Sequence, residues 1–137
     1  MTLRYILDTN IFIYIRSRRP PHIRARFERL DPGEAAMSVI TYGELLYGAE
    51  KSAERTLAIR RLEEFAAVIP VLSLPDSAAV AYGTIRAQLE KKGHMIGNND
   101  LWIAAHVRAA DLTLVTNNER EFRRVTGLKI ENWARAS

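Results

Sequence analysis

The sequence predicts a three-layer α/β/α domain built on a short, mainly parallel sheet of four or five strands. Short runs rich in Val, Ile and Leu alternate with longer segments that carry apolar residues at helical spacing. This alternation is typical of a parallel sheet whose strands are joined by right-handed helical crossovers. The runs lack the alternating pattern of a half-exposed sheet, so both faces of the sheet should be buried. Because the chain contains no repeat and no linker, we expect one domain over residues 1–137.

The expected strands and helices alternate along the chain. The strands are predicted at 3–8, 35–40, 68–73, 112–116 and 128–132. The helices are predicted at 10–16, 21–30, 41–50, 53–67, 76–92, 100–110 and 118–125. In the second helix, Ile23, Phe27 and Leu30 lie at helical spacing. Gly93 marks the end of the fifth helix, since glycine commonly follows the last helical residue. The segment 100–110 is apolar on nearly every side and should therefore be central and buried.

Composition limits the chemistry that this chain can perform. Its 47% hydrophobic and 26% charged residues are those of an ordinary globular protein. The absence of cysteine excludes disulfides, thiolate metal sites and cysteine nucleophiles. No apolar run approaches the roughly 18 residues that span a membrane. The first residues also lack the pattern of a signal peptide, so we expect a cytoplasmic protein.

Positive charge is concentrated near the beginning of the chain. The net charge is +4, and residues 1–30 carry seven Arg side chains against two acidic ones. A basic surface of this kind suits a polyanion such as nucleic acid. We predict that Arg16, Arg18 and Arg19 contact the phosphates of such a partner. The alternative is that these arginines only form the solvated face of a helix.

Acidic side chains stand where the predicted strands end or where the following helices begin. They are Asp8, Glu44, Asp100 and Glu121. In an open parallel sheet, ligands bind at the carboxyl ends of the strands. We therefore expect these carboxylates to share one pocket. The polar residues that could orient a water molecule, a substrate or a carboxylate beside them are Asn10, Thr116, Asn117 and Asn118.

Each of these acids also has an ordinary structural explanation. The turn-forming sequence at Asp8 suits an Asx turn. Thr41 and Glu44 have the spacing of a capping box, with Thr41 as the N-cap residue. Asp100 would be stabilised by the helix dipole at the start of its helix, and Glu119 could act in the same way near Glu121. These explanations stay open at the level of sequence.

Carboxylates that share a pocket require a cation to offset their mutual repulsion. Ligands that are all oxygen atoms favour Mg²⁺ or Mn²⁺ over zinc. Such ions activate water for the in-line displacement of a phosphodiester. The three histidines, His22, His94 and His106, lack metal-ligand spacing, and His106 should point away from Asp100 on their common helix. An acidic pocket that holds metal ions and a basic surface around it together indicate phosphodiester hydrolysis.

The ordered set of motifs resembles a PIN-domain ribonuclease, specifically a toxin of the VapC type from a bacterial toxin–antitoxin pair. The matching segments are Tyr5-Ile6-Leu7-Asp8-Thr9-Asn10, Glu44-Leu45 with Tyr47-Gly48-Ala49-Glu50, Ile96-Gly97-Asn98-Asn99-Asp100 with Ile103-Ala104-Ala105-His106, and Leu114-Val115-Thr116-Asn117-Asn118 with Glu121-Phe122. They extend over essentially the whole chain. No single motif is decisive, whereas their order is highly specific.

The resemblance implies a compact α/β/α fold and a Mg²⁺- or Mn²⁺-dependent endoribonuclease, with transfer RNA as the leading substrate. It also implies a homodimer and a cognate VapB-type antitoxin that binds DNA. By motif position, Asp8, Glu44 and Asp100 would be the metal ligands and catalytic acids. Many members carry a further Asp near the position of Asn117 or Asn118, where this chain has amides. Glu121 is the expected substitute, and the departure puts the affinity for a second metal ion in doubt.

Three other classes of protein compete with this interpretation. A receiver-like phosphoacceptor domain needs a pair of acids at the first strand end, where this chain has only Asp8. A haloacid-dehalogenase-type phosphatase needs a carboxylate at the position of Asn10. A metal-free RNA-binding module would tolerate the loss of Asp8. Calorimetry with divalent ions, combined with RNA cleavage in Mg²⁺ or EDTA, separates these classes.

Overall fold

The computed structural model describes residues 2–17, 19 and 21–134, which leaves Arg18 outside the described residues. A five-stranded sheet lies at the centre, with strand order β3-β2-β1-β4-β5. All of its strand pairs are parallel. The strands are β1 (Tyr5–Leu7), β2 (Ala35–Ser38), β3 (Val71–Leu72), β4 (Thr113–Val115) and β5 (Lys129–Glu131). Each predicted strand is therefore confirmed, although each is shorter than expected.

Helices connect the strands as predicted. The described residues form α1 (Thr9–Ser17), α2 (Pro21–Glu28), α3 (Val39–Glu50), α4 (Arg55–Val68), α5 (Ser77–Lys92), α6 (Asn98–Ala109) and α7 (Glu119–Phe122). Helix α5 ends at Gly93, whose φ of 69° is left-handed and suits glycine at a helix end. Helix α7 is much shorter than the predicted 118–125. None of the helices in the described ranges is both long and apolar enough to cross a membrane.

Both faces of the sheet are covered, which confirms the three layers. On one face, Ile6 packs in a cluster with residues of α5 and α6, including Ile85 and Leu101. On the other face, Tyr5 and Leu7 pack with residues of α1 and α2. Side chains of a strand alternate between its two faces, so the three residues of β1 serve both layers of the core. As expected, α6 is central, with Leu101 and Ile103 to Val107 buried.

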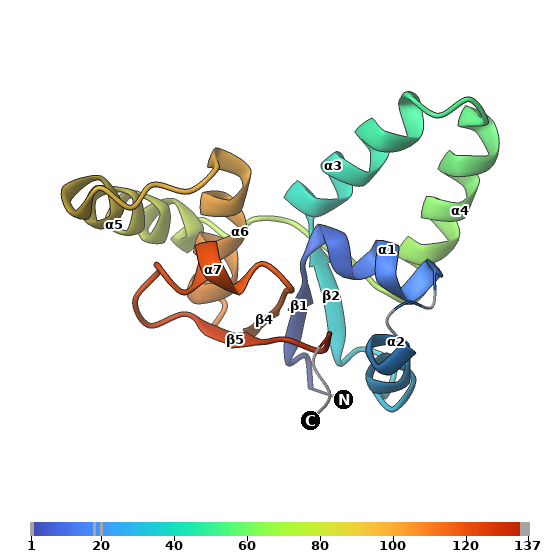
Figure 1. The fold of residues 1–137 in the computed structure, drawn as a ribbon, viewed down its shortest axis with the longest axis horizontal. Coiled ribbons are helices and arrows are strands. Elements are labelled where there is room, and N and C mark those ends of the chain that lie inside the picture. Colours follow the sequence, from blue (N-terminus) through green and yellow to red (C-terminus); the bar gives the residue numbers. More distant parts are fainter. Residues whose placement is uncertain (1, 18, 20, 135–137) are drawn as a thin grey trace.

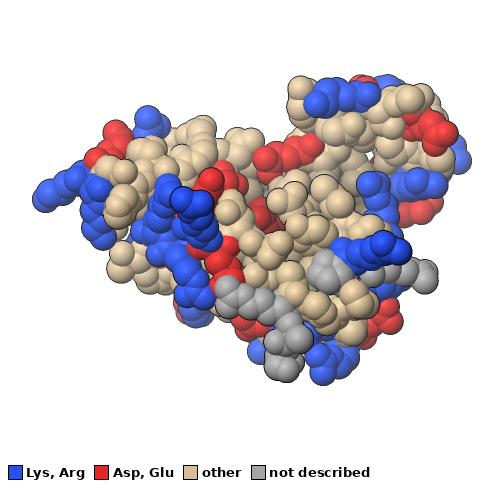
Figure 2. All heavy atoms as spheres, viewed as in Figure 1, with Lys and Arg blue, Asp and Glu red and all other residues tan. Residues whose placement is uncertain are grey.

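Two helical hairpins extend in different directions from the carboxyl end of the sheet (Figure 1). One is formed by α3 and α4 and the other by α5 and α6. The space-filling view shows a hollow between these two arms, with acidic side chains gathered in it (Figure 2). Basic side chains lie around it on both arms and on the lower face in this view. This arrangement agrees with the expected acidic pocket inside a basic surface.

The N-terminus of α3 lacks the capping box that was the alternative explanation for Glu44. Ser38, the last residue of β2, is the N-cap, and its Oγ accepts a hydrogen bond from the Ile40 N–H at 3.2 Å. Thr41 is instead buried inside the helix, and its Oγ1 has no partner among the described residues. The structure excludes this alternative explanation of Glu44, because β2 continues directly into α3 with no intervening loop. The helix therefore begins before Thr41, and Glu44 is free for another role.

The two helices that carry Glu44 and Asp100 are joined by a buried hydrogen bond. It links His106 Nδ1 on α6 with Ser38 Oγ at 2.8 Å. Both residues are buried, and burial lowers the pKa of His106, which favours the neutral ring. A neutral ring can accept the Ser38 hydroxyl hydrogen while Ser38 Oγ accepts from Ile40. His106 thus supports the N-terminus of α3 and, as predicted, does not join the acids.

Candidate acidic active site

Asp8 is the most deeply buried of the predicted acids. It directly follows β1, and only 5% of its surface is exposed. Its Oδ1 accepts the Thr9 N–H at 2.8 Å and its Oδ2 accepts the Thr116 hydroxyl at 2.8 Å. An Asx turn would use the N–H of Asn10, so that structural explanation does not describe this carboxylate. The buried acid is instead held by donors from two neighbouring strand ends.

Competing effects set the proton affinity of Asp8. Burial, the largest effect, raises its pKa, and the hydrogen bonds from Thr116 and Thr9 act in the opposite direction. The charges of Glu44 and Glu121 raise the pKa further. The charged form is thus supported by local donors but opposed by burial and by the surrounding acids.

Asp100 is the point at which the acidic cluster converges. It lies in the first turn of α6 and is half-buried. Burial, the charge of Asp8, a hydrogen bond to Glu121 and the charges of Glu121 and Glu44 raise the pKa of Asp100 to about 7. A hydrogen bond between two carboxyl groups requires one of them to hold a proton. The fold therefore brings the four predicted acids together from the end of β1, α3, α6 and α7.

Glu44 is held on the opposite side of the cluster. It lies in α3 and is half-buried. Its Oε1 accepts the Thr9 hydroxyl at 2.6 Å, and its Oε2 lies 3.5 Å from Asn99 Nδ2. Thr9 thus contacts two acids, through its N–H to Asp8 and its hydroxyl to Glu44. Sequence reasoning did not assign Thr9 a role, although its place beside Asp8 was a usable signal.

The predicted polar residues do not all reach the acids. Thr116 does, through its hydroxyl bond to Asp8. Asn117 Nδ2 instead donates to the Tyr14 hydroxyl at 3.2 Å, and the Asn118 N–H donates to Thr116 Oγ1 at 2.9 Å. Asn10 is exposed and makes no side-chain hydrogen bond within the described part of the chain. An orienting role toward the acids is therefore supported for Thr116, whereas Asn117 and Asn118 stabilise the loop after β4.

The four carboxylates match a hard divalent cation in chemistry, because all of their donor atoms are oxygen. Burial and, to a smaller degree, repulsion from the neighbouring acids raise the pKa values of Asp8 and Asp100, and a bound cation would offset both effects. Within the described ranges, however, no three acidic or histidine side chains are already arranged as a ligand set. A cation would therefore draw them closer together.

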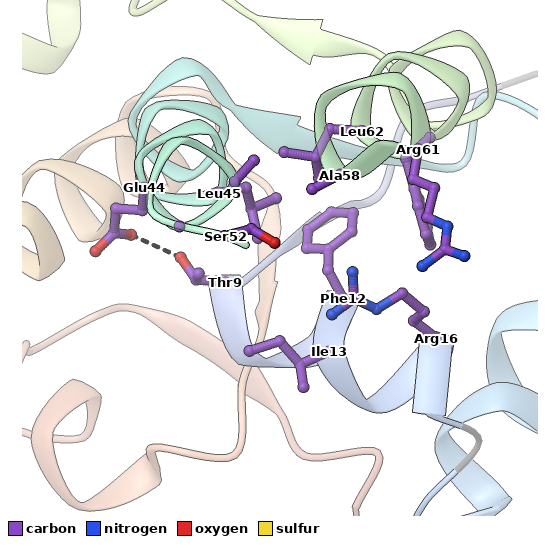
Figure 3. A pocket seen from close by; sticks show the side chains of 13 residues that line it. Thr9, Phe12, Ile13, Arg16, Glu44, Leu45, Ser52, Ala58, Arg61 and Leu62 are labelled. Atoms are coloured by element: carbon purple, nitrogen blue, oxygen red, sulfur yellow. Dashed lines mark hydrogen bonds between the residues drawn. The ribbon is translucent and has the colours of Figure 1, made fainter. Parts of the chain in front are cut away.

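A groove of about 330 Å³ adjoins the acids between α1, α3 and α4. Figure 3 shows Thr9 and Glu44 at one end and the guanidinium groups of Arg16 and Arg61 at the other. The apolar lining consists mainly of Phe12, Ile13, Leu45, Ala58, Leu62 and Phe65. Sequence reasoning did not place Arg61 or most of these lining residues here.

From the sequence we expected an antitoxin-binding groove lined by residues of the early helices such as Ile11, Ile15, Leu46 and Tyr47, with the core as the alternative location, and none of the four lines the groove beside Glu44. Ile11 and Ile15 belong to the core and are nearly inaccessible. Tyr47 is 64% exposed but does not line the groove. One turn separates Ile11 from Ile15, so both share the core-facing side of α1. Phe12 belongs to the same core cluster but also lines the groove, and the exposed Ile13 turns toward it.

Comparison with known proteins agrees with this fold and this site. The PIN domain family matches residues 5–128. The chain therefore belongs to the PIN-domain family. It is 47% identical to Ribonuclease VapC2 of Haemophilus influenzae over 96% of this chain and 98% of the relative. It is 45% identical to the tRNA(fMet)-specific endonuclease VapC of Shigella flexneri over 96% and 99% of the two chains. Within the family, these relatives place it among the VapC ribonucleases.

Solved structures show the same relationship. The chain matches VapBC-1 from nontypeable Haemophilus influenzae with a TM-score of 0.89 and 39% identity, over 97% of this chain and all of the other. It matches the DNA-bound VapBC complex of Salmonella typhimurium with a TM-score of 0.89 and 42% identity, over 96% and 99% of the chains. The three-layer PIN fold predicted from the sequence is thus confirmed.

The raised pKa of Asp100 predicts how stability depends on pH in EDTA. Its pKa is about 7 in the folded protein, against 3.8 for an unperturbed aspartate. Between these pH values the folded state binds more protons than the unfolded state, so the free energy of unfolding decreases as pH rises. The contribution of Asp100 to stability is therefore lost as pH rises through about 7. Urea denaturation should therefore give a lower free energy of unfolding at about pH 8 than at about pH 5.

The variant Asp100→Asn should flatten this dependence and be more stable than the wild type at about pH 8. Asp76→Asn is the control, because Asp76 is exposed and lies outside the acidic cluster. Equal pH slopes for Asp100→Asn and the wild type would contradict the prediction.

Proposed function

We propose that this chain is the toxin of a bacterial toxin–antitoxin pair and cleaves RNA at its acidic cluster with a bound divalent cation, Mg²⁺ or Mn²⁺. The observation that carries the proposal is the convergence of three other carboxylates, those of Asp8, Glu44 and Glu121, on Asp100, whose pKa is raised to about 7. Four unrelated structural acids would not be expected to meet at the ligand-binding edge of a parallel sheet. Membership of the VapC ribonucleases supplies the reaction class.

Asp8, Glu44 and Asp100 would hold the cation, with Glu121 as the fourth acid. When bound, Mg²⁺ or Mn²⁺ supplies a more acidic water and stabilises the charge of the leaving oxygen. Thr116 and Thr9 keep the Asp8 carboxylate in place, and Thr9 also orients Glu44. Asp100 and Glu121 share a hydrogen bond, and their carboxylates would have to be ionised to hold a cation. The acids therefore provide the negative charge that attracts a cation, and the threonines fix the orientation of the Asp8 and Glu44 carboxylates.

Transfer RNA is the substrate that the relatives favour. The tRNA(fMet)-specific endonucleases of Shigella flexneri and Salmonella typhimurium are 45% and 44% identical to this chain over nearly their whole length. We therefore infer an RNA substrate of the tRNA class for this chain. Sequencing of the RNA ends produced after induction in cells would identify the molecule and the bond that is cut.

We expect Asp8→Asn and Asp100→Asn each to reduce RNA cleavage by on the order of 100-fold or more, since each removes a charged metal ligand. Glu44→Gln should also lose activity without losing stability, because Ser38 and not Glu44 caps α3. Cleavage of a tRNA substrate in Mg²⁺, with EDTA as the blank, measures all three. Glu63→Gln is the matched control on the exposed face of α4. Unchanged cleavage by Asp8→Asn or Asp100→Asn would overturn the assignment, and RNA binding without cleavage by the wild type would favour a metal-free binding module.

Arginines beside the groove would bind the phosphates of the substrate. Arg16 and Arg19 are exposed, and Arg16 lies across the groove from Arg61 (Figure 3). No ion pair occupies Arg16 or Arg61 within the described part of the chain, so their charge is available to a polyanion. The predicted third residue, Arg18, lies outside the described residues.

Replacement of Arg16, Arg18 and Arg19 by Ala should weaken RNA binding and reduce its salt dependence. Each phosphate contact that is lost removes about 0.7 from the slope of log affinity against log salt for single-stranded RNA. Binding titrations in Ca²⁺ at several salt concentrations measure this slope. Arg108→Ala, near the far end of α6 from the acids, is the control. A salt slope equal to that of the wild type would show that these arginines do not contact RNA phosphates and only form the solvated face of a helix.

The apolar groove would bind the antitoxin. An amphipathic antitoxin helix can bury its apolar face against Phe12, Ile13 and Leu45. Since Glu44 lies at the end of this groove, a basic side chain of the same helix would reach the acids from there. Known structures with this fold include VapBC complexes, which supports the presence of such a partner. We also infer that the toxin forms a homodimer, which light scattering of the purified chain would test.

Ile13→Asp should weaken the antitoxin complex at least about tenfold, because it places a charge in an apolar interface. Ile13 is 45% exposed, so the free toxin should remain folded and active on RNA. Thr126→Asp adds the same charge to the exposed connection before β5 and serves as the control. Calorimetry with the co-expressed antitoxin measures the affinity, and equal affinities for Ile13→Asp and the control would place the antitoxin elsewhere.

A further inference from the structure

A chain of hydrogen bonds leads from α5 to the edge of the acidic cluster. Arg86 Nη1 lies 2.8 Å from the Tyr82 hydroxyl oxygen, and that oxygen lies 2.7 Å from Asn98 Oδ1. Asn98 is the first residue of α6, two residues before Asp100. The function proposed above assigns no role to these three residues.

The chemistry of the three side chains determines which group donates and which accepts in each of these hydrogen bonds. A guanidinium group can only donate, so the Tyr82 oxygen accepts from Arg86 and its hydrogen is given to Asn98 Oδ1. The reversed amide would leave the Tyr82 hydrogen and the Asn98 carbonyl without a partner among the described residues. The amide oxygen of Asn98 therefore faces Tyr82, and its Nδ2 carries two hydrogens that have no acceptor among the described residues.

Aromatic packing holds the hydrogen-bonded side chains in place. The ring of Tyr82 stacks on Trp102 of α6 with a centroid distance of 3.9 Å and an interplanar angle of 16°. The Arg86 guanidinium lies 5.9 Å from the Tyr82 ring centroid and also pairs with Glu90. Trp102 and Asp100 belong to the same helix. The position of the Tyr82 hydroxyl is therefore linked to the helix that carries the central acid.

Asn98 lines an open hollow of about 380 Å³ together with Glu44, Gly97, Asn99 and Asp100. The two acids in this hollow offer only acceptor oxygens when they are ionised. The amide of Asn99 is directed toward Glu44. Asn98 thus contributes a side-chain donor that is not engaged with a neighbouring side chain in the described part of the protein. A phosphodiester that approaches the acids presents two non-bridging oxygens, both of which accept hydrogen bonds.

We propose that Asn98 donates from Nδ2 to a non-bridging phosphate oxygen of the RNA substrate, and that Tyr82 and Arg86 fix the orientation of its amide. The inference rests on the proposed ribonuclease function. A phosphate is favoured over a base because Asn98 is exposed at an open hollow and not enclosed in a fitted pocket. Asn98 is a substrate-binding residue in this view, and Tyr82 is a positioning residue.

Kinetics on a short oligoribonucleotide that the wild type cleaves in Mg²⁺ test the proposal. Asn98→Asp keeps the acceptor for Tyr82 but replaces the Nδ2 donor by a charged oxygen, so it should raise KM at least about tenfold. Tyr82→Phe keeps the ring stacked on Trp102 and should raise KM about threefold to tenfold by releasing the amide. Both variants should keep the wild-type melting temperature within a few degrees. Gln88→Ala, on the exposed face of α5, is the control.

The double variant separates positioning from packing. In an Asn98→Ala background, Tyr82→Phe should have no further effect on KM, because there is no amide to orient. An equal cost of Tyr82→Phe in both backgrounds, or an unchanged KM for Asn98→Asp, would overturn the proposal. If the wild type itself cleaves no RNA in Mg²⁺, the proposed function fails. If the wild type cleaves and the Asn98 variants match it, only this inference fails.

Methylphosphonate linkages identify the oxygen that is bound. Placed one at a time along the oligoribonucleotide, they remove a non-bridging oxygen and its charge. One linkage should raise KM for the wild type but not for Asn98→Ala. If instead removal of a base carbonyl has the effect that depends on Asn98, the phosphate assignment is wrong.

Discussion

The repulsion among acids at the carboxyl end of the sheet is the constraint around which this molecule is built. Strand β1 lies between β2 and β4, so the chain leaves its carboxyl end with helical crossovers on both sides. In open α/β sheets, this is the position where ligands bind. The pairing of Leu7 with Val115 places Asp8 beside Thr116, which explains their hydrogen bond. A buried charge at this position is tolerated because donors from two strand ends hold it.

The other acids are brought to Asp8 by helices that the core holds firmly. Helix α6 is buried along most of its length, and the bond between His106 and Ser38 connects it to the start of α3. The positions of Asp100 and Glu44 are therefore coupled through the interior and not through the surface. Such a scaffold can keep like charges close together, because separating them would disrupt a packed core.

The elements of the fold could be predicted from the sequence because their signals are local. Strand β1 and helix α6 are recognised by run length and apolar spacing alone. The capping-box alternative for Thr41 and Glu44 fails because its spacing is also a local signal, whereas the true start of α3 depends on β2 continuing into the helix. The residues that line the groove beside Glu44 were not identified from the sequence, for a related reason. Apolar spacing shows that α1 is amphipathic, but it does not show which apolar residues of α1 face the core and which face α4.

The site was predictable where chemistry and topology coincide, and less so where side chains act through distant partners. Four acids at strand and helix ends were sufficient to predict a shared pocket, because a parallel sheet brings those ends to one edge. Of the two hydrogen bonds that link Arg86, Tyr82 and Asn98, only the first could be predicted from the sequence. Arg86 and Tyr82 are four residues apart on α5, so their contact follows from helical periodicity. Their link to Asn98 depends on the packing of α5 against α6, through the stacked rings of Tyr82 and Trp102. The orientation of one exposed amide is therefore a tertiary property, although its hydrogen bonds involve only three side chains.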